Sequence, residues 1–157
     1  MLMKKSQIGF TIIELVTIVI LIGILAVAVL PKFDGTASYE AHTHRAQLIS
    51  ALRLTQQRAM QQTDGSFCNH LVIESKKYGV PDRIDCTNTD IPESGWQPDA
   101  TGHIVESRYE MAFSPKVIVF SSMGRPLGCA EPCTIDVSSS VETLQIKIES
   151  EGYIHAI

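Results

Sequence analysis

The sequence lacks the short motifs that mark common catalytic sites. It contains no G-x-S-x-G nucleophile turn, no H-E-x-x-H zinc motif and no phosphate-binding glycine loop. Its cysteines form no C-x-x-C pair and have no histidine at a usual ligand spacing, which argues against a zinc site. We therefore expect no catalysis, no metal and no cofactor. A membrane-anchored periplasmic hydrolase has no side-chain constellation to support it.

Positive charge is also scarce. The chain has 13 basic and 17 acidic residues, and Lys4 and Lys5 both lie among its first nine positions. The remainder therefore carries 11 basic against 17 acidic residues, a balance of −6. Because an acidic domain is a poor binder of polyanions, we expect no nucleic-acid partner.

The five histidines form no evident group. His42 and His44 stand two positions apart in a segment that reads as helix, so their side chains point apart and are expected on a solvated face. His70, His103 and His155 are isolated in the sequence. This pattern does not indicate a metal centre.

One long apolar run dominates the N-terminal part. The 21 residues from Phe10 to Leu30 carry a single charge, Glu14. A bilayer core takes about 20 apolar residues in a helix, and Lys4 and Lys5 precede the run. The pattern predicts a single pass through a membrane, with residues 1–9 in the cytoplasm and the rest exported. An ordinary signal peptide fits badly, and a plain anchor leaves Glu14 unexplained.

All four cysteines follow this run, and their even number favours two disulfides in an oxidising compartment. Cys129 and Cys133 bracket only three residues, so a local loop is the easiest closure, which leaves Cys68 to pair with Cys86. Four cysteines allow three connectivities, and free thiols are a further alternative.

The N-terminal segment resembles a known processing signal. The segment Lys4–Leu30, with its Lys-Lys pair, Gly9 and the sequence FTIIELV, looks like the class III signal of type IV pilins and type II secretion pseudopilins. The resemblance implies that a prepilin peptidase cuts between Gly9 and Phe10 and N-methylates Phe10. Glu14 would then be the assembly residue, pairing with the methylated amine of a neighbouring copy, and Pro31 would kink the helix.

The rest of the chain predicts an α+β fold. Apolar positions at three- and four-residue steps indicate a helix over 36–62, and residues 66–157 read as β-rich. The expected architecture is a long N-terminal helix, with a membrane half and an amphipathic half, packed on a small antiparallel sheet. The expected divisions are a leader (1–9), a transmembrane and polymerisation helix (10–33) and a periplasmic globular domain (34–157). The helix positions expected to face the sheet are Ala37, Ala41, Leu48, Ala51, Leu52, Thr55 and Ala59.

The C-terminal part carries a second resemblance. A strand and glycine turn over 119–126, strands at 134–137 and 144–149, and a closing hairpin through 152–154 look like minor pilins of the GspH/FimT type. The C-x-x-x-C loop that follows Arg125 resembles minor pilins of the mannose-sensitive haemagglutinin (MSHA) pilus.

Together the resemblances imply a minor structural subunit of a type IV pilus, in the fibre or at its tip, that supports pilus biogenesis and adhesion. The alternative is a pseudopilin of a type II secretion system. A DNA-uptake pilin is disfavoured because no arginine follows Arg125. The implied partners are major and minor pilin subunits, prepilin peptidase, the inner-membrane assembly platform and, before assembly, the inner membrane. The mature subunit is then expected in the periplasm and in the fibre at the cell surface.

Overall fold

The structure is a computed structural model that describes residues 10–29, 36–62, 68–81, 86–87, 89–91, 101–105 and 110–157. The chain divides into two units, Met1–Thr36 and Ala37–Ile157. Each unit is described by itself below. The predicted leader, the Gly9 side of the cleavage site and the predicted kink at Pro31 lie outside the described residues.

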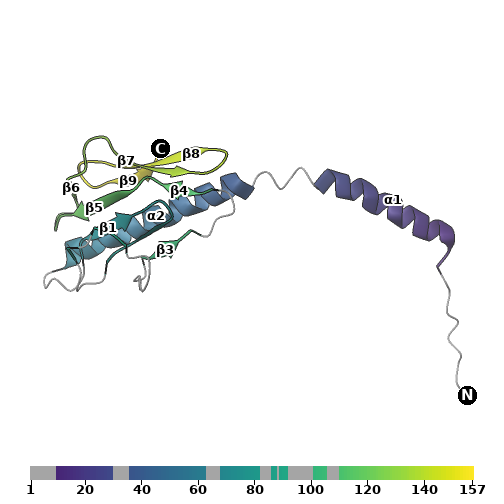
Figure 1. Ribbon diagram of the computed structural model, residues 1–157, viewed down its shortest axis with the longest axis horizontal. Coiled ribbons are helices and arrows are strands. Elements are labelled where there is room, and N and C mark those ends of the chain that lie inside the picture. Colours follow the sequence, from purple (N-terminus) through teal and green to yellow (C-terminus); the bar gives the residue numbers. More distant parts are fainter. Residues whose placement is uncertain are drawn as a thin grey trace, which may run out of the picture. The chain divides into compact units, whose positions relative to one another are not determined.

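The described residues of the first unit include the helix α1 (Ile12–Val29; purple in Figure 1). Among the residues that the structure describes, no helix combines the length and the apolar character needed to cross a membrane. The predicted single-pass inner-membrane anchor is therefore contradicted. The 18 residues of α1 extend about 27 Å at 1.5 Å per residue, whereas a hydrocarbon core of about 30 Å takes about 20. The helix also carries Glu14 in its first turn.

All of α2 (Thr36–Gln61) except its first residue belongs to the second unit, where the helix lies lengthwise beside the strands in Figure 1. Small and apolar side chains recur along one face of α2, so that face can approach the sheets closely. All seven positions that the sequence assigned to this face are at most 7% exposed. They are Ala37, Ala41, Leu48, Ala51, Leu52, Thr55 and Ala59.

Nine strands form two antiparallel sheets in the described part of this unit. Sheet A has the order β3-β2-β1-β5-β6 and sheet B the order β4-β7-β8-β9. The strands of sheet A are β1 (His70–Ile73), β2 (Lys77–Gly79), β3 (His103–Ile104), β5 (Lys116–Phe120) and β6 (Pro126–Leu127). Those of sheet B are β4 (Ala112–Phe113), β7 (Cys133–Ser138), β8 (Thr143–Ile148) and β9 (Ile154–Ala156).

The predicted fold, a long N-terminal helix on one small sheet, is therefore wrong. The described chain has two separate helices and is mostly β in its second unit, with two sheets. The first helix ends at Val29, two residues before Pro31, and proline disfavours helical geometry in the residue that precedes it. Strands of two residues, such as β3 and β4, are too short for a sequence period to reveal.

The core of the second unit lies between α2 and both sheets. It joins Leu48 and Leu52 of α2 to Ile118 of sheet A and to Ile135 and Ile146 of sheet B, all of them fully buried. The alternating pattern of β7, with every second residue buried, turns one face of sheet B towards this core. Burial of each such side chain stabilises the fold by about 1.5–3 kcal/mol before the entropic cost of ordering it.

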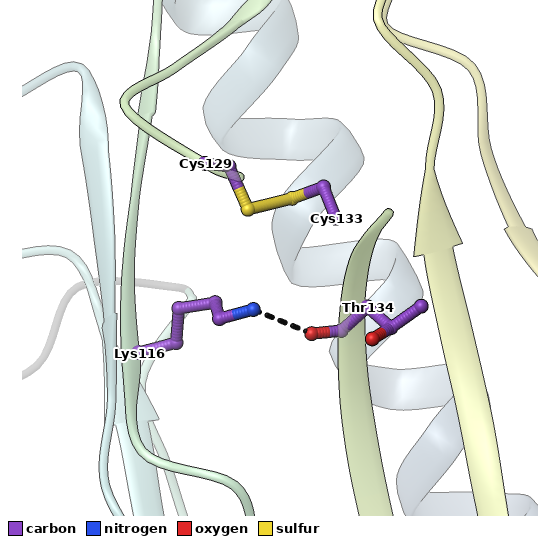
Figure 2. The surroundings of a disulfide bond; sticks show 4 residues. All are labelled: Lys116, Cys129, Cys133 and Thr134. Atoms are coloured by element: carbon purple, nitrogen blue, oxygen red, sulfur yellow. Dashed lines mark hydrogen bonds between the residues drawn. A yellow bond between two sulfur atoms is a disulfide. The ribbon is translucent and has the colours of Figure 1, made fainter. Parts of the chain in front are cut away.

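Two disulfides close loops of the second unit, and they are the pairs that the sequence favoured. Cys68 pairs with Cys86, and Cys129 pairs with Cys133. Figure 2 shows the second disulfide near a tie between the sheets: the Lys116 ammonium at the start of β5 donates to the Thr134 carbonyl in β7 at 2.7 Å. The described residues contain no free cysteine.

Candidate functional site

The main candidate site is the exposed apolar surface of α1. Every described side chain from 10 to 26 is exposed, from 42% at Ile18 to 84% at Ile12 among the large apolar residues. Soluble monomers rarely expose a contiguous apolar surface of this extent, which usually marks a site of interaction. This surface is therefore suited to association with other apolar surfaces.

Glu14 is the one charged residue on α1. The Glu14 backbone amide donates to the Thr11 hydroxyl at 3.3 Å, and the Leu15 amide donates to the Thr11 carbonyl at 3.2 Å. Thr11 thus caps the helix, and Thr11-x-x-Glu14 has the spacing of a capping box. A carboxylate in the first turn also interacts favourably with the helix dipole. This local role was missed from the sequence, although the spacing was visible there.

The exposed carboxylate of Glu14 has no hydrogen-bond or ion-pair partner among the residues that the structure describes. Phe10 lies just before the helix and is 79% exposed. Gly9, on the other side of the predicted cleavage site, falls outside the described residues. The structure thus places Phe10 and Glu14 at the same end of an exposed helix, and the charge has no partner within the described ranges of the chain.

A second candidate site is a groove of about 620 Å³ beside α2. Its lining includes Thr43, Gln47 and Ser50 from α2, and Tyr78 and His103 from β2 and β3. Burial raises the pKa of the Tyr78 hydroxyl far above its ordinary value, so this tyrosine stays neutral. The groove therefore offers neutral hydrogen-bonding side chains and two imidazoles, those of His42 and His103.

The structure brings together two histidines that the sequence left apart. His103 Nε2 and His44 Nδ1 lie 3.3 Å from each other, in residues separated by 59 positions. His44 is half-buried and was wrongly expected on a solvated face. Burial lowers the pKa of His103 below its usual range, and the nearby His44 lowers it further.

His42 behaves differently from His44, as expected from their spacing of two residues. Its Nδ1 lies 3.1 Å from an Arg45 guanidinium nitrogen, and its Nε2 lies 3.9 Å from a Glu142 carboxylate oxygen. That oxygen is buried and has no hydrogen-bond partner among the described residues. His42 is thus directed towards the β7–β8 turn, whereas His44 is directed towards β3.

The C-terminal hairpin that carries the second resemblance is tied to α2. The Gln56 side-chain amide donates to the carbonyl oxygens of Gly124 and Gly152, each at 2.7 Å. An exposed ion pair between Arg125 and Glu151, at 2.7 Å, joins the same two turns. Arg125 therefore links its own turn to the C-terminal turn through Glu151.

Within the described part of the chain, no group of three or more His, Cys, Asp or Glu side chains is placed to hold a metal ion. Comparisons with known proteins found no match: no family model, no curated protein and no solved structure is significantly similar to this chain. The family resemblance therefore depends on the residues of this sequence alone.

Proposed function

We propose that this chain is a minor structural subunit of a type IV pilus, similar to minor pilins of the MSHA system, and that it has no catalytic role. The observation that carries the proposal is the exposure of α1, whose apolar side chains are open to solvent over their described length. The buried core of the second unit is made of residues from that unit. Copies of the same helix in a fibre would cover these side chains.

The carboxylate of Glu14 would set the register between copies. In this proposal prepilin peptidase cuts before Phe10 and methylates the new terminal amine, which stays cationic. Phe10 and Glu14 are four residues apart, about one helical turn, so a neighbour shifted by one turn would bring its amine to this carboxylate. Pairing offsets the desolvation of both charges, whereas an unpaired charge buried in the fibre costs several kcal/mol.

The test compares two variants in a bacterium that assembles the fibre. Glu14→Gln removes the charge and retains the side-chain volume, while Thr11→Ala removes the helix cap and retains the charge. We expect Glu14→Gln to reach wild-type levels in cells but to fall at least tenfold in sheared filaments. Thr11→Ala, which costs about 1 kcal/mol of helix stability, should still be incorporated.

Mass spectrometry of the sheared filaments gives the second measurement. We expect the chain to begin at N-methylated Phe10. A chain that begins at Met1, or normal incorporation of Glu14→Gln, would refute the proposal. An equal loss from both variants would assign Glu14 to helix capping rather than to pairing between subunits.

A further inference from the structure

A pair of imidazoles lies where α2 meets β3. His44 Nδ1 and His103 Nε2 are 3.3 Å apart, and the contact is partly buried. Aromatic rings flank both: Tyr78 lies 5.4 Å from His103 between ring centroids, and Phe113 lies 6.5 Å from His44. Packing on two sides restricts the rotamers of both histidines and holds the two nitrogens facing each other.

The separation of the two nitrogens matches one edge of a zinc tetrahedron. Zinc binds histidine nitrogen at about 2.0–2.1 Å with tetrahedral angles, which places two ligating nitrogens about 3.3–3.4 Å apart. In the square-planar geometry that Cu²⁺ prefers, two adjacent ligating nitrogens would lie closer together, about 2.8 Å apart at similar bond lengths. Without a metal, one of the two rings must carry a proton on its facing nitrogen to make a hydrogen bond at this distance.

We propose that His44 and His103 form a two-histidine Zn²⁺ site in the wall of the groove beside α2. His103 lines the groove, so the remaining coordination positions would face it and would be filled by water or by a ligand atom of a bound molecule. The described residues supply no third protein ligand to this site. The inference is independent of the proposed filament role, because none of its residues belongs to α1.

Zinc titration of the purified full chain, prepared without a polyhistidine tag, tests the site. We expect one saturable Zn²⁺ site per chain, measured by competition with a chromophoric chelator, and Co²⁺ in its place should give the intense visible absorption of tetrahedral coordination. His44→Gln and His103→Gln should each weaken binding at least tenfold. His42→Gln is the matched control: His42 also lines the groove, but its two ring nitrogens face Arg45 and Glu142, so the affinity should stay unchanged.

Nitrogen-15 NMR spectra of the imidazole rings test the site in the wild-type chain, so this measurement does not depend on the folding of a variant. Zinc should leave His44 protonated only at Nε2 and His103 only at Nδ1, because both facing nitrogens then use their lone pairs for the metal. Unchanged spectra at saturating zinc would overturn the proposal. A zinc affinity that falls as much in His42→Gln as in His44→Gln would also overturn it. So would a zinc affinity that is unchanged in the His44→Gln/His103→Gln double variant.

Discussion

The two units of this chain use apolar residues in opposite ways. In α1 the large apolar side chains are exposed, whereas in the second unit Leu48, Leu52 and Ile118 are fully buried. Their compositions also differ, because Glu14 is the single charge in α1 whereas α2 carries one acidic and three basic residues. The apolar face of α2 packs against two sheets, whereas the large apolar side chains described in α1 remain exposed.

A matched pair of leucine truncations gives the sharpest test of this difference. Leu52→Ala should lower the free energy of unfolding by about 2–5 kcal/mol, because it leaves a cavity in the core. Leu21→Ala, at a side chain that is 59% exposed, should change it by less than about 0.5 kcal/mol. Urea unfolding followed by near-UV circular dichroism measures both. Equal losses would show that α1 is packed as tightly as α2.

Alanine substitutions at two glycines with positive φ distinguish the cost of steric crowding from the cost of backbone strain in the second unit. A Cβ on Gly152, at φ 93°, would collide with the Gly124 carbonyl and the Gln56 amide. Gly152→Ala should cost about 3 kcal/mol from strain and overpacking together. Gly128→Ala, at φ 70° with open space around the Cβ, should cost only about 1 kcal/mol. Thermal unfolding compares the two, and similar losses would show that the contact around Gln56 adapts freely.

The hydrogen bonds of Gln56 and the ion pair of Arg125 are expected to differ less in their contributions to stability. Gln56→Ala leaves two partly buried carbonyl groups without their donor and should cost about 1–2 kcal/mol. Arg125→Gln removes an exposed ion pair and should cost less than about 0.5 kcal/mol. Chemical denaturation of both variants tests the ranking. A larger loss in Arg125→Gln would contradict the assignment of the main tie to Gln56.

The smallest expected effect is a pH dependence from Glu149. A hydrogen bond from Lys147, and then one from His155, lower the pKa of this exposed carboxyl in the folded chain. Its contribution to stability is therefore present at neutral pH and is lost as the pH falls below the unfolded value of about 4.3. Melting temperatures between pH 7 and pH 3 should fall less steeply for Glu149→Gln than for the wild type. An unchanged slope would exclude this contribution.

Local patterns predicted a large part of the second unit. Residues 36–62 were expected as helix and α2 covers Thr36–Gln61, with its buried face at the expected positions. The strands expected at 134–137 and 144–149 correspond to β7 and β8, and the strand expected at the start of 119–126 overlaps the end of β5. These segments are long enough for a period of 3.6 or 2 to be visible. The short strands β2, β3, β4 and β6 gave no such signal, and the division into two sheets was missed with them.

The sequence by itself determined the local features of this protein: the helix of the second unit and its buried stripe, the longer strands, the favoured cysteine pairs and the single charge in the apolar run. Each depends on residues near one another in the chain or on a simple period. Only the tertiary structure decided the facing nitrogens of His44 and His103 and the Gln56 tie to Gly124 and Gly152. These contacts join residues 59 or more positions apart, and no local preference of either residue specifies them, because packing of α2 against both sheets brings them together.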